Sequence, residues 1–191
     1  MGDQVMQYPA IDWLAITPLI ILLGGMMINL VIASLTRVWR RAWYAIATVE
    51  LAVACVIVEM FLWHDVNTDG SRIIINNAIS IDHFTLFCWI GIAVALALVS
   101  LSTSEYLRRE SLDGPEVYAL YICAALGAMI MTASNDMIVL FLGLETLSIA
   151  LYVLAASHRR RTESQESGLK YFILGGFASA FFLYGIALIY G

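Results

Sequence analysis

The chain has 191 residues, of which 61% are hydrophobic and only 13% are charged, and its formal net charge is -5. Soluble domains carry about 25% charged residues, so this composition excludes an ordinary soluble domain and favours an integral membrane protein. The 3 Cys residues exclude a disulfide scaffold. The net charge says little about partners. We expect no nucleic-acid partner, and the composition indicates the lipid bilayer as a partner.

Six apolar stretches follow one another along the chain, each ended by a charged or turn-forming cluster, and we interpret them as membrane-spanning helices of about 20 residues each. They cover approximately residues 14–35, 43–63, 84–101, 117–131, 137–156 and 169–190. The first residues carry no Lys or Arg, whereas a signal peptide begins with a basic segment, so we expect the first span to be retained. The sequence predicts an all-α polytopic helix bundle that forms one membrane domain over residues 1–191.

The segment between the second and third spans, residues 65–82, is the longest connection. Residues 73–75 and 78–81 are β-prone and flank Asn76 and Asn77, which predicts a small β-hairpin over the membrane surface. A plain apolar loop that packs on the helix ends fits this sequence equally well.

Potential metal ligands do not follow a recognisable spacing. The segment around the second connection contains His64, Asp65, Asp69, Asp82 and His83. Cys55, Cys88 and Cys123 occur singly in three different spans, and we interpret them as small apolar residues. We therefore expect no metal site and no cofactor in this chain.

The basic residues predict the topology. Eight of the ten Lys and Arg residues lie in the loops after the first, third and fifth spans: Arg37, Arg40, Arg41, Arg108, Arg109, Arg159, Arg160 and Arg161. Loops rich in Lys and Arg stay on the cytoplasmic side of a membrane. With six spans, both termini are then expected on the outer side.

Glu145 lies near the middle of the fifth predicted span. A charged side chain at that depth costs about 3 kcal/mol or more, so it must be neutralised, paired or hydrated. Helical spacing places Glu145, Ser148 and Tyr152 on one face, where they form a polar stripe suited to a file of water molecules. We interpret Glu145 as a proton-relay group; the alternative is a carboxyl group that only packs against a neighbouring helix.

Four further charged residues lie in or near spans. Lys170 lies at the start of the sixth span. It is either a second relay candidate or a side chain that snorkels to the membrane interface. Glu50 and Glu59 are nine residues apart in the second span and point to opposite faces of that helix. We expect Glu59 to be interfacial and Glu50 to face the bundle, which makes Glu50 a third, weaker relay candidate. Asp136 and Asn135 are interpreted as the N-cap of the fifth helix.

Two motifs carry a resemblance to a known family. Residues 134–145 read SNDMIVLFLGLE and resemble the fifth-helix signature of the antiporter-like membrane subunits of respiratory complex I. Residues 166–175 read ESGLKYFILG and resemble the start of the sixth helix of these subunits. The continuation SAFFLYG, residues 179–185, is most similar to the subunit N branch of bacterial NADH-quinone oxidoreductase.

The resemblance implies proton translocation coupled to electron transfer from NADH to quinone, in the cell inner (plasma) membrane. Glu145 takes the position of a glutamate that modulates a lysine on the seventh helix, and Lys170 matches a lysine of the sixth-helix motif. Implied partners are the other membrane-arm subunits, which together with this chain form a translocase. NADH, FMN, iron–sulfur clusters and quinone react elsewhere in such a complex, so no redox chemistry is implied in this chain itself.

The family pattern continues beyond the sixth helix, where this sequence stops. The helices from about residue 117 resemble the start of a five-helix antiporter repeat, and we expect the chain to represent only the amino-terminal part of the family pattern. One alternative is a subunit of a multi-subunit Na+/H+ antiporter or membrane-bound hydrogenase, which shares the fifth-helix glutamate. The other alternative is a non-conducting structural scaffold in which Glu145 only packs.

Overall fold

A computed structural model describes residues 12–35, 42–109 and 114–190. Within these ranges it contains six helices, α1 (Trp13–Leu35), α2 (Ala42–Asp69), α3 (His83–Arg109), α4 (Pro115–Ala133), α5 (Met137–Ala155) and α6 (Thr162–Tyr190). All six are long and apolar enough to cross a membrane. The prediction of an all-α bundle with six candidate spans is therefore confirmed.

The observed helices are longer than the apolar stretches at three places. Helix α2 continues to Asp69, α3 to Arg109, and α6 already begins at Thr162. The extra turns are polar, and backbone hydrogen bonds extend a helix irrespective of side-chain polarity. An apolar run therefore marks the part of a helix that lies within lipid, while its polar turns extend beyond that run.

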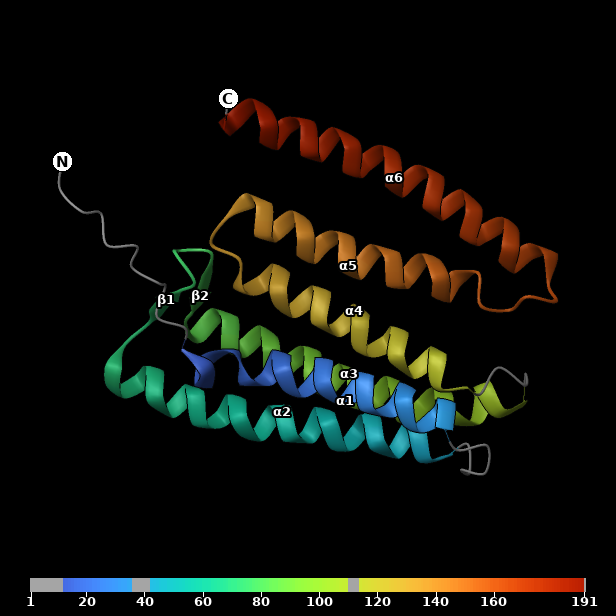
Figure 1. The fold of residues 1–191 in the computed structure, drawn as a ribbon, viewed down its shortest axis with the longest axis horizontal. Coiled ribbons are helices and arrows are strands. Elements are labelled where there is room, and N and C mark those ends of the chain that lie inside the picture. The colour runs from blue at the N-terminus through green and yellow to red at the C-terminus, as the bar shows by residue number, and fades with distance from the viewer. Residues whose placement is uncertain (1–11, 36–41, 110–113, 191) are drawn as a thin grey trace.

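The bundle is built in layers, which Figure 1 shows. Helices α1, α2, α3 and α4 pack together, α5 lies along α4, and α6 lies along the outer side of α5. The core between the first four helices includes the fully buried side chains of Leu22, Leu62 and Trp89. The indole Nε1–H of Trp89 donates a 2.8 Å hydrogen bond to the carbonyl oxygen of Met129, so α3 and α4 are joined inside the core.

Helices α4 and α5 approach with their backbones in contact. A Cβ atom on Gly143 would lie 2.7 Å from the amide nitrogen of Met131 and 2.9 Å from the carbonyl oxygen of Gly127. Real Cβ atoms do not approach backbone this closely, so the contact requires glycine. This close contact fixes the position of α5, which carries Glu145, against the core.

The segment between α2 and α3 forms a β-hairpin. Strands β1 (Arg72–Ile74) and β2 (Ile79–Ile81) pair antiparallel, with Arg72 opposite Ile81 and Ile74 opposite Ile79. Asn76 and Asn77 have φ angles of 51° and 67°, which Asn adopts more readily than most residues. The hairpin prediction is confirmed over the alternative of a plain loop.

The hairpin holds the turn between α4 and α5 in place. The backbone N–H of Asn135 donates to the carbonyl oxygen of Ala78 at 2.9 Å, and its side-chain amide donates to the carbonyl oxygen of Asn77 at 2.8 Å. Ser134 and Ile79 add a β-bridge. The start of α5 is therefore positioned by a segment that precedes it by more than 50 residues.

The two ends of the bundle differ in charge. The hairpin, Trp13 and Tyr190 lie at one end, while the α5–α6 connection and the last turn of α3 lie at the other (Figure 1). The described basic residues of the predicted cytoplasmic loops, at positions 109 and 159–161, lie at this second end. Arg37, Arg40 and Arg41 lie outside the described residues.

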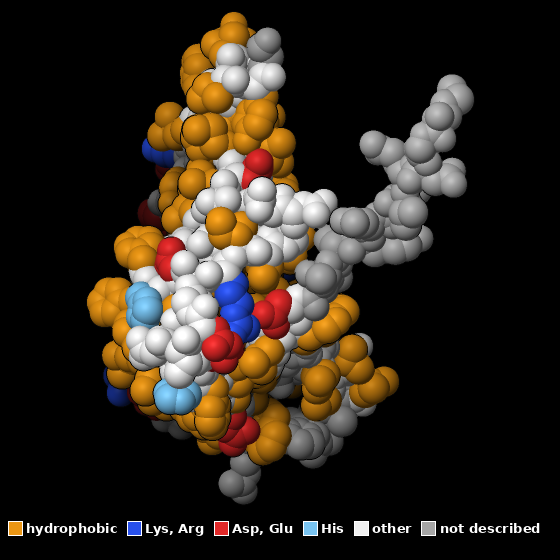
Figure 2. Space-filling model, turned by 90° about the vertical axis from the view of Figure 1, so that its left-hand side faces the viewer, with side chains coloured by type: hydrophobic (Ala, Val, Ile, Leu, Met, Phe, Trp, Pro, Cys, Tyr) orange, Lys and Arg blue, Asp and Glu red, His pale blue; other side chains and the backbone are white. Residues whose placement is uncertain are grey.

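Figure 2 looks onto the hairpin end, where a small group of basic and acidic side chains is surrounded by hydrophobic ones. The guanidinium of Arg72 pairs with Asp12 at 3.1 Å, with Asp65 at 2.7 Å and with Asp69 at 3.0 Å. The hydrogen bond to Asp12 and the nearby carboxylates raise the pKa of Arg72 above its ordinary value. This cluster ties the start of α1 and the end of α2 to β1.

Candidate functional site

Asp136 caps the start of α5, as predicted. Its Oδ1 atom accepts hydrogen bonds from the backbone N–H groups of Ile138 at 2.7 Å and Val139 at 3.4 Å. Its Oδ2 atom accepts a 3.0 Å hydrogen bond from the hydroxyl of Tyr190. The backbone bond from Ile138, followed by the bond from Tyr190, holds the pKa of this carboxyl below its ordinary value. Asp136 therefore both caps α5 and joins it to the end of α6.

Glu145 lies on the face of α5 that meets α6. Its half-buried carboxylate accepts a hydrogen bond at Oε1 from the hydroxyl of Ser179. In the same interface, the hydroxyl of Tyr152 lies against Gly175, where a Cβ atom would overlap it. Glu145 and Tyr152 thus share one face of α5, as the predicted stripe requires, and Ser148 between them is also half-buried.

Aromatic contacts flank the Glu145–Ser179 pair on both sides. Phe141, one turn before Glu145, contacts Phe182 with ring centroids 6.1 Å apart. Two turns after Glu145, the ring of Tyr152 packs edge-on against Tyr171 at 4.8 Å. The Glu145–Ser179 hydrogen bond therefore lies between two aromatic ring contacts along the α5–α6 interface.

Lys170 does not contact Glu145 in the described structure. Its side chain is 70% exposed, and its ammonium pairs with Glu166, one turn earlier on the same helix, at 2.5 Å. Lys170 and Ser179 are nine residues apart, which places them on opposite faces of α6 and about 14 Å apart along its axis. The structure therefore separates the two principal relay candidates.

The orientation predicted for Glu50 and Glu59 is wrong. Glu50 is exposed on the outside of α2, whereas Glu59 is 0% exposed. The nine-residue spacing correctly predicts opposite faces, but it does not tell which face packs against α1 and α3. The structure gives no support to Glu50 as a relay group.

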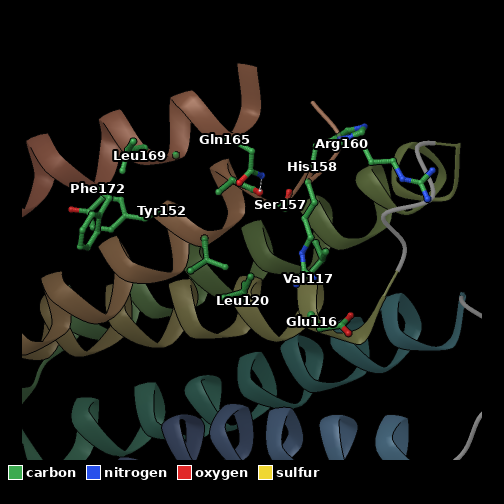
Figure 3. A pocket seen from close by; sticks show the side chains of 14 residues that line it. Glu116, Val117, Leu120, Tyr152, Ser157, His158, Arg160, Gln165, Leu169 and Phe172 are labelled. Carbon is green, nitrogen blue, oxygen red and sulfur yellow. Dashed lines mark hydrogen bonds between the residues drawn. The ribbon is translucent and has the colours of Figure 1, made fainter. Parts of the chain in front are cut away.

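A cavity of about 750 Å³ opens between α4, α5 and α6 near the α5–α6 connection. We call this end of the bundle, which carries the arginines at positions 109 and 159–161, the basic end. Figure 3 shows Tyr152, Leu169 and Phe172 along one part of its wall, with His158 and Arg160 towards the α5–α6 connection. Because Tyr152 lines this cavity, the cavity reaches one end of the polar stripe of α5. The sequence offered no signal for it, since its wall combines residues from three helices and a connection.

The acidic residues near the hairpin do not gather as a metal site. In the described ranges, no group of three or more His, Cys, Asp or Glu side chains has metal-binding geometry. Asp65 and Asp69 pair with Arg72, and the Nε2 atom of His83 lies 2.8 Å from the side-chain oxygen of Asn67. These side chains serve to hold the hairpin end together.

Comparisons with known proteins agree with the resemblance seen in the motifs. Residues 134–191 match the family described as NADH:quinone oxidoreductase/Mrp antiporter, transmembrane. The chain is 48% identical over 113 residues to NADH-quinone oxidoreductase subunit N 2 of Koribacter versatilis, covering 59% of this chain and 23% of the relative. It is 34% identical over 210 residues to NADH-quinone oxidoreductase subunit N of Salinispora arenicola, covering 97% of this chain and 40% of the relative.

Two solved structures share the fold. The chain is similar to a chain of respiratory complex I from Thermus thermophilus with a TM-score of 0.74 and 25% identity, covering 91% of this chain and 36% of that chain. It is also similar to a chain of the membrane-bound sulfane sulfur reductase, an archaeal respiratory membrane complex, with a TM-score of 0.78 and 26% identity, covering 94% and 37%. The chain thus spans less than half the length of the relatives that it matches.

Proposed function

Because the chain is a homologue of the antiporter-like membrane subunits, with subunit N of NADH-quinone oxidoreductase among its relatives, we propose that it serves in proton translocation in the membrane arm of such a complex. In this proposal it supplies the first six helices of a subunit N, and its helices from α4 onward begin an antiporter repeat. Its partners are the other membrane-arm subunits. NADH, FMN, iron–sulfur clusters and quinone react elsewhere, and this chain binds none of them.

The observation that carries the proposal is the Glu145–Ser179 pair in the α5–α6 interface. Glu145 lies in a helix that has no other charged residue, and a lasting isolated charge there is costly. The neighbouring hydroxyl can form a hydrogen bond with the protonated and with the ionised carboxyl, since a hydroxyl can both donate and accept. Glu145 can therefore take up and release a proton within the membrane.

The cavity at the basic end supports a route to Glu145. Its wall includes Tyr152, and Ser148 lies between Tyr152 and Glu145 on the same face of α5. In the proposed route, water in the cavity delivers protons along these hydroxyl groups to Glu145. Lys170 is proposed as a second relay group that acts on the opposite face of α6, away from α5; Glu50 has no part in the route.

The proposed orientation has the basic end in the cytoplasm and both termini on the outer side of the plasma membrane. The described arginines of the third and fifth loops support it, because they lie together at one end of the bundle. Cysteine-accessibility labelling of Ser157→Cys and Asn76→Cys in intact cells tests it. Labelling of Asn76→Cys by an impermeant reagent, with Ser157→Cys protected, is expected; the reverse pattern contradicts the orientation.

Substitution of Glu145 tests the function. In the assembled complex, Glu145→Ala should lower the number of protons pumped per NADH oxidised, while the complex still assembles. An unchanged ratio contradicts the relay role, and loss of assembly would favour the scaffold alternative, in which Glu145 only packs.

A second candidate function is that of a membrane subunit in an antiporter or hydrogenase-type complex. The similarity to the sulfane sulfur reductase complex favours this candidate. Co-purification decides between the two candidates. Recovery of the tagged chain with NADH dehydrogenase activity supports the first proposal, and recovery in a complex without quinone reductase activity overturns it.

A further inference from the structure

Glu59 is a buried carboxyl group that the proposed relay does not use. It lies in α2 and is 0% exposed, and neither of its carboxyl oxygens has a hydrogen-bond partner among the described residues. Ten residues separate it from Asp69 at the end of α2, which places it about 15 Å along the helix from that end. A polar group without a partner at such depth is rare, because burial without a hydrogen bond is costly.

Pro18 of α1 lies close to the part of α2 that precedes Glu59. One turn before Glu59, the thiol of Cys55 donates to the carbonyl oxygen of Pro18 at 3.4 Å. Pro18 has no N–H, so the carbonyl of Leu14, one turn earlier in α1, lacks its helical donor. Helices α1 and α2 run antiparallel (Figure 1), so the residues that follow Cys55 in α2 run beside those that precede Pro18 in α1.

The helices around Glu59 provide no charge to pair with it. Helix α1 contains no ionisable side chain, and Glu50 of α2 itself is exposed. On α2, His64, Asp65 and Asp69 lie towards the hairpin end. The other two neighbouring helices are α3 and α4. Their described acidic and basic side chains lie at the helix ends: His83, Glu105, Arg109 and Glu116. Their remaining titratable side chains are thiols and phenols: Cys88, Cys123, Tyr106, Tyr118 and Tyr121. An ionised Glu59 would therefore be a buried charge without a counter-ion, which is strongly unfavourable.

We propose that Glu59 is a proton-binding site separate from the Glu145 site. A proton bound to the carboxylate makes a neutral carboxylic acid, and the new O–H group can donate, directly or through one water molecule, to the carbonyl of Leu14. The proton removes the buried charge, and this hydrogen bond gives the buried O–H group an acceptor. The ligand is a proton. Glu59 lies on α2, whereas Glu145 and Ser179 lie on α5 and α6, so this site is separate from the proton route proposed above.

Infrared difference spectroscopy on the full chain in lipid nanodiscs at neutral pH tests the proposal. The difference between the wild type and Glu59→Gln should show loss of a protonated carboxyl C=O band. The control on the same helix, Asp69→Asn, should show loss of carboxylate bands only, because Asp69 pairs with the guanidinium of Arg72 at the end of α2. Loss of carboxylate bands in Glu59→Gln as well would overturn the proposal.

A second measurement covers the case in which Glu59→Gln does not fold. In a Glu145→Gln chain that retains Glu59, the proposal expects a protonated carboxyl band that persists at a pH where exposed carboxyls are ionised. Absence of such a band at neutral pH overturns the proposal. Because Glu145 is absent from this variant, the result does not depend on whether Glu145 relays protons.

Discussion

The hydroxyl of Ser179 donates a hydrogen bond to the carboxylate of Glu145 across the interface of α5 and α6. In the described structure, this hydrogen bond joins a side chain of α6 to the polar stripe of α5, which consists of Glu145, Ser148 and Tyr152. Phe141 and Phe182 lie on one side of this pair, and Tyr152 with Tyr171 on the other.

Removal of the Ser179 hydroxyl should impair proton transfer at Glu145. Ser179→Ala leaves the half-buried carboxylate without this donor, a change that typically costs about 1 kcal/mol in stability. We expect proton pumping per NADH in the assembled complex to fall. Ser179→Thr keeps a hydroxyl at the same position and is the matched control, expected to pump as the wild type does. Equal pumping by the Ala and Thr variants would show that the hydrogen bond is dispensable.

A methyl group at position 175 should separate α5 from α6. Gly175→Ala places a Cβ atom on the Tyr152 hydroxyl, whereas Gly176 on the same helix has nothing within 4 Å of a Cβ atom. Overpacking of this kind costs about 1–3 kcal/mol. Thermal unfolding in detergent should therefore show a lower Tm for Gly175→Ala and little change for Gly176→Ala. Tyr152→Phe, which removes the hydroxyl, should restore part of the loss; equal Tm values for the two Ala variants contradict the close contact.

Acid should weaken the cap of α5. Hydrogen bonds from Ile138 and Tyr190 lower the pKa of Asp136 below its ordinary value of 3.8, so its stabilising effect is present above that value and is lost as the pH falls through the lowered pKa. At neutral pH Asp136→Ala should therefore have a lower Tm than the wild type, and the difference should shrink as the pH falls below 3.8. A difference that stays constant down to strongly acidic pH would contradict this account of the cap.

Loss of Arg72 should loosen the hairpin end. Arg72→Gln leaves the carboxylates of Asp12, Asp65 and Asp69 close together without their cation. We expect a lower Tm and faster amide hydrogen exchange in the hairpin at low salt. Arg109→Gln is the control, because Arg109 is 76% exposed and its pair with Glu105 is a surface pair, worth about 0.3–0.5 kcal/mol. Similar effects of the two substitutions would argue against a structural role for the Arg72 cluster.

The membrane-spanning helices and the start of α5 could be predicted from the sequence because local rules decide them. Apolar runs of sufficient length mark the spans, and an Asp residue directly before such a run favours an N-cap. The hairpin was one of two possible interpretations, since short β-prone runs also occur in loops that pack on helices. Its pairing, and its hydrogen bonds to Asn135, required the folded chain.

The site could be predicted only in part. The depth of Glu145 and its helical spacing from Tyr152 indicated a polar stripe, but the partner of Glu145, Ser179, lies 34 residues further along the chain. Glu50 was predicted to face the bundle and Glu59 to be interfacial, but Glu50 is exposed and Glu59 is buried. Periodicity shows that two residues lie on opposite faces of a helix, whereas packing decides which of the two faces is buried. The position of Lys170 on the far side of α6 likewise depends on which face of α6 meets α5.

The ratio of protons pumped per NADH oxidised, measured in proteoliposomes that contain the assembled complex, tests the role of Glu145 most directly. Glu145→Gln removes the ability to exchange a proton while it nearly preserves the size of the side chain, and Glu50→Gln makes the same change at an exposed position. The account predicts a reduced ratio for Glu145→Gln and the wild-type ratio for Glu50→Gln. A wild-type ratio for Glu145→Gln in a fully assembled complex would contradict it.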